Sequence, residues 1–191
     1  MRPKLILASS SPRRLALLEL IGIRPDSVVP ADIDETPREG ELARDLAGRL
    51  ALEKAEAVAA REKGALILAA DTVVAVGRRI LPKAEDEATV RECLKLLSGR
   101  AHRVYSGVAL AGPGDERRLK IVETRVKVRR LEAGDIDAYI ASGEWNGKAG
   151  GYAIQGLFAA HIIEIIGSHP NVVGLPLYQT VNLLRGVGWR A

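Results

Sequence analysis

The sequence predicts an α/β fold in which two lobes share one mixed β-sheet. Short apolar runs alternate with amphipathic stretches along the chain, and this alternation is typical of strands layered with helices. Hydrophobic residues make up 47% of the chain and charged residues 27%, a balance that excludes a disordered or collagen-like protein. A length of 191 residues, with no internal repeat or clear linker, suits a single domain spanning residues 1–191.

The N-terminal part of the chain predicts a strand followed by a capped helix. Residues 4–8, which contain the apolar run Leu5-Ile6-Leu7-Ala8, predict a strand. Ser11 suits the N-cap of the following helix, Pro12 suits its first position, and Gly22 suits its end. Next we expect a short strand, a polar loop and a long amphipathic helix, at residues 28–29, 32–40 and 41–63.

The middle of the chain predicts a buried strand that ends in polar residues. The apolar run at residues 65–70 is followed by Asp71 and Thr72, which places Asp71 at the end of the strand. Residues 73–76 and 79–81 then predict a hairpin. The remaining expected elements are a helix at 86–98, strands at 102–111 and 117–130 joined by a turn at 112–115, a helix at 135–142, a strand at 158–166 and a helix at 175–185.

Charge and cysteine content limit the classes of function. The chain carries a net charge of +4, and its basic residues are scattered rather than gathered into a stripe. With one phenylalanine and four tyrosines, it lacks the material of a nucleic-acid stacking surface. A single cysteine, Cys93, fits a reducing compartment. No apolar run is long enough for a membrane span and none at the N-terminus reads as a signal peptide, so we expect a soluble cytoplasmic protein.

The segment Ser9-Ser10-Ser11-Pro12-Arg13-Arg14 is the first candidate for ligand binding. It lies where a strand meets a helix, and free N–H groups at a helix N-terminus attract anions. Two arginines in the first turn carry the wrong charge for the helix dipole, and a bound polyphosphate would compensate for them. A solvated arginine pair at a capped helix explains the same residues, and composition alone leaves both interpretations open.

Three further residues are candidates with ordinary alternatives. A carboxylate at the position of Asp71 can hold a divalent metal or accept a proton from water, or it can simply bond to nearby backbone. Lys54 continues the apolar face of its helix, where a lysine usually extends its stem to reach water. Lys83, just after the expected hairpin, reads by itself as a surface lysine.

A glycine-rich segment at residues 145–156 is the last candidate. Its glycines let the backbone approach a ligand closely, although a flexible loop is the simpler interpretation. It matches neither the Walker A loop nor the dinucleotide fingerprint. The histidines lack metal-ligand spacing, and Cys93 shares an apolar helix face, so it reads as a core residue.

Taken together and in order, these segments resemble the Maf family of septum formation inhibitor-like nucleoside triphosphate pyrophosphatases. The resemblance covers nearly the whole chain. Its blocks are Ala8-Ser9-Ser10-Ser11-Pro12-Arg13-Arg14, Asp34-Glu35, Glu53-Lys54-Ala55, Ala70-Asp71-Thr72-Val73, Leu97-Ser98-Gly99-Arg100, residues 148–156 and residues 171–176.

The resemblance implies a cytoplasmic, usually dimeric enzyme with an elongated α/β fold and a cleft between its lobes. It implies cleavage of a nucleoside triphosphate to the monophosphate and pyrophosphate with a divalent metal, Mg²⁺ or Mn²⁺. The pattern around Lys148 and Gln155 resembles the branch that acts on dTTP and UTP. The alternative function is a nucleotide or nucleic-acid binding module that restrains cell division.

The resemblance also implies roles for individual residues. Asp71 matches the base that activates the attacking water, and Glu35 and Asp71 are the expected metal ligands. The residues expected to bind substrate are Ser9, Ser11, Arg13, Arg14, Lys54, Thr72, Lys83 and Gln155, of which Arg13, Thr72 and Gln155 match positions associated with choice of base. One departure is Pro82-Lys83-Ala84, where the family usually has Lys-Pro; Lys83 itself still aligns, and we expect the local backbone to differ.

Overall fold

The computed structural model describes residues 3–113 and 116–190. The described helices are α1 (Pro12–Leu20), α2 (Ala43–Arg61), α3 (Glu87–Leu97), α4 (Ala133–Ala141), α5 (His169–Val173) and α6 (Leu177–Gly186), with a 3₁₀ helix at Leu157–His161. The described strands are β1 (Leu5–Ala8), β2 (Ser27–Val28), β3 (Leu66–Val76), β4 (Arg79–Leu81), β5 (Lys83–Ala84), β6 (Ala101–Ala111), β7 (Arg117–Val128), β8 (Lys148–Ala149) and β9 (Ile162–Ile166).

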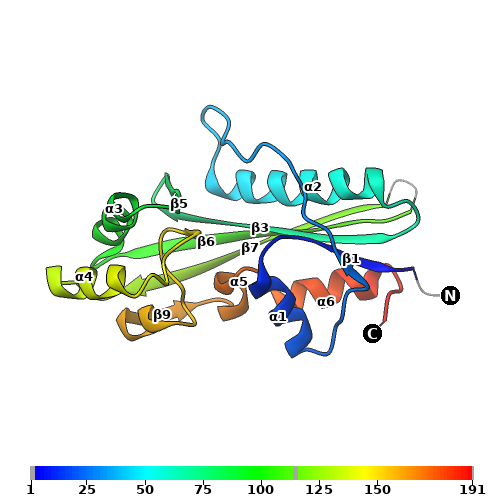
Figure 1. Cartoon of the computed structure of the whole chain (residues 1–191). Helices are drawn as coiled ribbons and strands as arrows, with labels where there is room; N and C mark the ends of the chain where they lie inside the picture. Colours follow the sequence, from blue (N-terminus) through cyan, green and yellow to red (C-terminus); the bar gives the residue numbers. More distant parts are fainter. Residues whose placement is uncertain (1–2, 114–115, 191) are drawn as a thin grey trace.

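The main sheet is mixed, as the sequence predicts. Its strand order is β2-β1-β3-β6-β7-β9, with β4 paired to β3, and β5 and β8 form a small separate sheet. β1 runs parallel to β2 and β3, whereas the other pairs in the main sheet are antiparallel. The long strands β3, β6 and β7 run the length of the molecule and give it an elongated shape (Figure 1).

Helices cover both faces of this sheet and divide the molecule into two lobes. α2 lies along one face of the long strands, whereas α1, α5 and α6 lie on the other side near the end that holds β1 (Figure 1). α3 and α4 lie at the opposite end. Separate apolar clusters fill the two lobes, one around Phe158 and one around Leu7 and Leu68. No described helix is long and apolar enough to cross a membrane.

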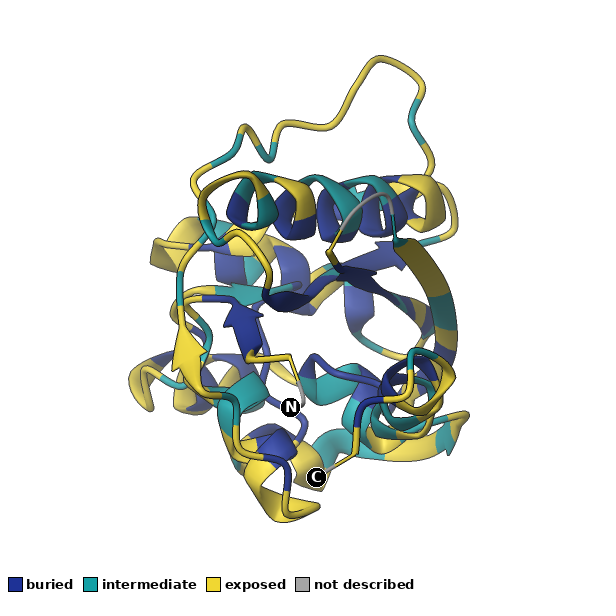
Figure 2. Ribbon diagram, turned by 90° about the vertical axis from the view of Figure 1, so that its right-hand side faces the viewer, coloured by how far each residue is buried: buried dark blue, intermediate teal, exposed yellow. Residues whose placement is uncertain are grey.

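The contact between α2 and β6 is unusually close and depends on a glycine. Figure 2 shows the buried side of α2 turned toward the sheet. A Cβ atom at Gly107 of β6 would lie only 2.2 Å from the carbonyl oxygen of Ala47 of α2. A side chain at position 107 would therefore push the helix away from the sheet. Gly107 pairs with Asp71 of β3, so this contact holds α2 close to the strand segment that carries Asp71.

The expectation that a strand ends at Asp71 is wrong, because β3 continues to Val76. The ladder between β3 and β6 is continuous from Ile67 to Ala75 and places Asp71 in the middle of the strand. The partner on the other side of β3 changes instead. The pairing with β1 ends at Ala69 of β3, and the pairing with β4 covers Val74 to Val76 of β3. Between them, residues 70–73 have no neighbouring strand on that side within the described chain, which opens the sheet beside Asp71.

Several other boundaries differ from the expectations. Residues 158–166 are not one strand, because a 3₁₀ helix at Leu157–His161 precedes β9. α5 was not expected, since five residues are too short to show a helical period. The helix is started by Pro170 in its first turn and by Ser168, whose hydroxyl accepts a hydrogen bond from Asn171 N. The long helix is shorter than residues 41–63 at both ends. Residues 114–115 of the expected turn lie outside the described residues.

Candidate active site

A cavity of about 280 Å³ lies beside the open stretch of β3. Its walls come from the β1–α1 junction, the loop before α2, α2 itself, β3, β5, the glycine-rich loop and the end of α5. The structure brings to this cavity every residue that the sequence predicts for the site: Ser9, Ser11, Arg13, Arg14, Glu35, Lys54, Asp71, Thr72, Lys83 and Gln155. Segments distant in sequence therefore meet at one place.

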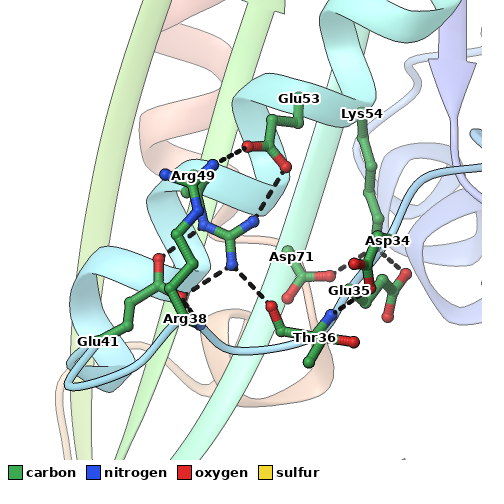
Figure 3. A network of polar contacts seen from close by, with 9 residues as sticks. All are labelled: Asp34, Glu35, Thr36, Arg38, Glu41, Arg49, Glu53, Lys54 and Asp71. Carbon is green, nitrogen blue, oxygen red and sulfur yellow. Dashed lines mark hydrogen bonds and ion pairs between the residues drawn. The ribbon is translucent and has the colours of Figure 1, made fainter.

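Lys54 is buried and forms ion pairs with two carboxylates. Its Nζ lies 2.6 Å from Oδ1 of Asp71 and 2.6 Å from Oε1 of Glu35 (Figure 3). Only 7% of Lys54 and 4% of Asp71 is exposed. The usual arrangement, a lysine that extends along the surface to water, therefore does not apply to Lys54. Its apolar stem continues the buried stripe of α2, and its charge is neutralised inside the protein.

Glu35 connects Lys54 to a second lysine. Its other carboxylate oxygen accepts a hydrogen bond from Lys83 of β5. Burial raises the pKa of Glu35, but hydrogen bonds from Lys54 and Lys83 outweigh this effect and hold the pKa at about 2. Glu35 is therefore an anion at neutral pH. The altered Pro82-Lys83-Ala84 sequence still delivers Lys83 to the cavity.

The loop that carries Glu35 is attached to α2 by Arg49. This guanidinium donates to both carboxylate oxygens of Glu41, at 2.6 and 2.8 Å, and to Glu53 at 3.0 Å. It also donates to the carbonyl of Thr36, the residue after Glu35, at 3.1 Å (Figure 3). The hydrogen bond from Arg49 lowers the pKa of Glu41 to about 2. These hydrogen bonds of Arg49 fix the polar loop in the position at which Glu35 contacts Lys54.

Arg14 is held by neutral acceptors. It donates to the carbonyl of Gly174 at 2.9 Å, to the hydroxyl of Ser9 at 3.2 Å and to that of Thr72 at 3.5 Å. Burial lowers the pKa of Arg14; the charge of Asp71 raises it and that of Arg13 lowers it. Burial also lowers the pKa of Arg13. Neither arginine forms an ion pair with a carboxylate in the described chain.

The glycine-rich loop is held in place by buried and charged groups rather than being free. The backbone N–H of Ala153 donates to the hydroxyl of Tyr139 at 3.0 Å. The carboxylate of Glu144 accepts from the N–H of Leu157 at 2.8 Å. Between these two attachments, Gln155 is exposed and lines the cavity. The two attachments therefore fix the ends of the backbone segment that carries Gln155.

The sequence analysis named the segments of other residues of the cavity wall but gave these residues no individual role. Lys148 and Tyr152 line it from the glycine-rich loop, and residues 172–174 line it from the end of α5. Tyr152 is supported from behind by His102, whose Nε2 lies 2.7 Å from the tyrosine hydroxyl. Burial lowers the pKa of His102 to about 4, so the imidazole is neutral at pH 7. The signal in the sequence that could have indicated a ligand contact of Lys148 is a cationic side chain placed among glycines, at Gly147 to Gly151.

The charges of the cavity suit a polyanionic ligand. The cationic lining residues are Arg13, Arg14, Lys54, Lys83 and Lys148, and the anionic ones are Glu35 and Asp71. The two carboxylates are paired with lysines, which leaves the other three cations without an ionic partner from the described cavity wall. Cations of this kind can neutralise phosphates, and the two carboxylates can accept a proton or hold a metal.

Comparisons with known proteins agree with this geometry. The model of the family "Maf-like protein" matches residues 4–187. A dTTP/UTP pyrophosphatase of Caulobacter vibrioides is 61% identical, over 98% of this chain and 97% of the relative. A dTTP/UTP pyrophosphatase of Gluconobacter oxydans is 64% identical, over 97% of this chain and 87% of the relative. A HAM1 protein from Coxiella burnetii shares the fold, with a TM-score of 0.54 and 18% identity over 97% of this chain and 100% of that one.

Proposed function

The chain belongs to the Maf-like protein family, and from this premise we propose that it hydrolyses dTTP and UTP to the monophosphate and pyrophosphate. The observation that carries the proposal is the buried Lys54, which holds two carboxylates in a cavity where Arg13, Arg14 and Lys148 form no ion pair with any described carboxylate. The relatives named dTTP/UTP pyrophosphatase support the choice of nucleotide.

Asp71 is the base in this proposal. Its carboxylate accepts a proton from a water molecule, and the hydroxide formed attacks the α-phosphorus of the nucleotide. The bond between the α-phosphorus and the oxygen that bridges to the β-phosphorus breaks, and pyrophosphate leaves with the electron pair. The water oxygen remains on the monophosphate, and Asp71 returns its proton to solvent. Lys54, whose Nζ lies 2.6 Å from Oδ1 of Asp71, holds this carboxylate in place beside the cavity.

The cationic residues bind the triphosphate and stabilise the charge that develops on the leaving pyrophosphate. Arg13 and Arg14 lie in the first turn of α1, and a helix N-terminus favours a bound anion. The hydroxyl of Ser9 accepts hydrogen bonds from Arg14 and from the N–H of Ser11, the side chain of Ser11 makes no cap hydrogen bond, and both serines line the cavity. Such fixed donors are the main contribution of proteins to phosphoryl chemistry.

A divalent cation, Mg²⁺ or Mn²⁺, is part of the proposal. No cluster of three His, Cys, Asp or Glu ligands exists among the described residues. Glu35 and Asp71 nevertheless converge on the same ammonium group, and Mg²⁺ is commonly held by one or two carboxylates together with substrate phosphates. The donor set therefore fits, with Glu35 and Asp71 as the protein ligands. When bound, the ion would polarise a phosphoryl oxygen and neutralise charge.

Arg13, Thr72 and Gln155 choose the base in this proposal. The amide of Gln155 offers a donor and an acceptor, which match the N3–H donor and adjacent carbonyl of uracil or thymine. Thr72 contributes a hydroxyl that lies 2.8 Å from the hydroxyl of Ser106. Cytosine reverses part of this pattern and would leave a polar group unpaired.

We also propose that the protein is a cytoplasmic homodimer, as the family resemblance implies. The free and buried Cys93 fits a reducing compartment. Exposed apolar side chains such as Leu20 and Tyr178 provide surface for a subunit contact. Light scattering of the purified protein tests the dimer, and a monomer at all concentrations would contradict it.

The function is tested with a panel of canonical triphosphates in the presence of Mg²⁺ or Mn²⁺, with products separated by ion exchange. We expect pyrophosphate and monophosphate, with the largest kcat/KM for dTTP and UTP. A diphosphate and orthophosphate as primary products would contradict the proposal. Binding of nucleotides without turnover of any of them would favour the alternative, a binding module that restrains cell division.

A further inference from the structure

Lys148 is a cation of the cavity wall that belongs to the sequence pattern of the dTTP and UTP branch but has so far been given no chemical role. It lies on β8, inside the glycine-rich loop, and is half-buried. Lys54 and Lys83 are neutralised by Glu35 and Asp71, but no carboxylate of the described residues lies within ion-pair distance of Lys148. An uncompensated charge in a built cavity needs either water or an anionic ligand.

The backbone around Lys148 is fixed by hydrogen bonds to the segment that carries Lys83. Lys148 pairs with Ala84 across the small sheet of β5 and β8. The N–H of Gly147 donates to Ala84 O at 2.8 Å, and that of Gly150 donates to Pro82 O at 2.9 Å. These bonds hold Lys148 beside the cavity. They distinguish it from a lysine that moves freely on a surface.

The ammonium group of Lys148 has unused donor capacity and a cationic neighbour. Its Nζ donates to Asn146 O at 3.0 Å, although an ammonium has three donors. Burial lowers the pKa of Lys148, and the positive charge of Arg13 lowers it further. Glu144 acts in the opposite direction, but its carboxylate is engaged by the N–H of Leu157. An anion near both cations would relieve their repulsion, which a neutral base cannot do.

We propose that Lys148 binds a phosphate group of the nucleotide together with Arg13, and that it retains the same contact with the pyrophosphate product. This inference rests on the proposed function, because it assigns Lys148 to the polyphosphate of that substrate. It separates two tasks within the glycine-rich loop. Lys148 binds phosphate at the start of the loop, and Gln155 reads the base near its end.

The test measures binding of inorganic pyrophosphate by titration calorimetry to the wild type and to variants at position 148. Lys148→Met removes the charge but keeps the apolar stem, Lys148→Gln is a second neutral variant, and Lys148→Arg keeps the charge. Lys95→Met is the matched control, because Lys95 is exposed on α3 and is not among the residues lining this cavity. We expect Lys148→Met and Lys148→Gln to weaken pyrophosphate binding about 10- to 100-fold, as for other hydrogen bonds to charged groups. Lys148→Arg and Lys95→Met should remain close to the wild type.

Turnover provides a second readout. The KM for dTTP should rise in Lys148→Met, whereas the ratio of kcat/KM for dTTP to that for dCTP should stay as in the wild type. Unchanged pyrophosphate affinity in both neutral variants, or no pyrophosphate binding by the wild type, would overturn the inference. A changed base preference with unchanged pyrophosphate affinity would overturn it as well and would place Lys148 at the base. If the wild type hydrolysed no triphosphate, the proposed function would fail, while the calorimetric comparison would still show whether Lys148 binds a polyphosphate.

Discussion

The ammonium nitrogen of Lys54 lies 2.6 Å from Oδ1 of Asp71, and the contact joins helix α2 to the middle of strand β3. The pair depends on packing as well as on charge, because α2 can approach the sheet this closely at Gly107, the partner of Asp71 on β6, since that residue lacks a side chain. The proposed base and the lysine beside it are therefore placed by the core of the protein rather than by a mobile loop.

Asp71→Asn should lower kcat by about 10²- to 10⁴-fold, the usual contribution of a general base. The KM for dTTP should change much less, because an amide of the same shape still occupies the site. Steady-state kinetics with dTTP measure both constants, and circular dichroism checks the fold. Asp137→Asn is the control, since Asp137 is an exposed carboxylate on α4 that pairs with Arg91. A variant with wild-type kcat would show that Asp71 only bonds to Lys54.

Arg49→Met should release the loop that carries Glu35 from α2. The variant loses the bonds to Glu41, Glu53 and the Thr36 carbonyl, which should destabilise the protein by roughly 1–3 kcal/mol. Tryptic cleavage after Arg38, within this loop, should become faster, and kcat/KM for dTTP should fall. Arg103→Met, which breaks a more exposed pair with Glu123, is the control and should leave both unchanged. Equal cleavage rates for Arg49→Met and wild type would contradict this role.

His102 should make the unfolding free energy depend on pH between about 6.5 and 4. Its folded-state pKa of about 4 lies below the ordinary value of 6.5, so the folded state binds a proton less readily than the unfolded chain. The contribution of neutral His102 to the unfolding free energy is fully present above pH 6.5. It is lost as the pH falls from 6.5 through 4, and the loss is on the order of 3 kcal/mol. Urea unfolding of wild type and His102→Gln at pH 7 and pH 4.5 measures this difference. If the unfolding free energy of His102→Gln fell with pH as much as that of the wild type, this role of His102 would be contradicted.

Gln155→Glu should reduce the preference for dTTP and UTP more than it slows dTTP itself. A carboxylate cannot donate a hydrogen bond to a base carbonyl, and an unpaired group costs roughly 1–3 kcal/mol, about 10- to 100-fold in preference. The measurement is kcat/KM for dTTP, UTP, dCTP, dATP and dGTP with both proteins. Unchanged ratios in the variant would mean that Gln155 only supports the loop.

Most of the fold could be predicted from the sequence because its signals are local. The leucine spacing of α2, the proline at the start of α1 and the alternating runs of β6 and β7 each specify an element within a few residues. The continuity of β3 could not be predicted in this way. Whether a strand ends at a polar pair or continues through it depends on its neighbours, and here β6 pairs without interruption while β1 gives way to β4.

The same limit applies to the site. The residues could be named from motifs, but the sequence could not show that Lys54 reaches Asp71 and Glu35 at once, since this depends on how closely α2 packs on the sheet. Nor could it show Lys148 at the cavity, because that position is set by pairing between β5 and β8, two strands of only two residues each. Short pairings of this kind leave no periodic signal.

Hydrolysis of dTTP in ¹⁸O-labelled water tests the central claim most directly, because it identifies both the bond that breaks and the phosphorus that water attacks. If water near Asp71 attacks the α-phosphorus, mass spectrometry will find one labelled oxygen in dTMP and none in the pyrophosphate. Asp71→Asn should form both products far more slowly. Label in the pyrophosphate, or formation of dTDP and labelled orthophosphate, would contradict the account.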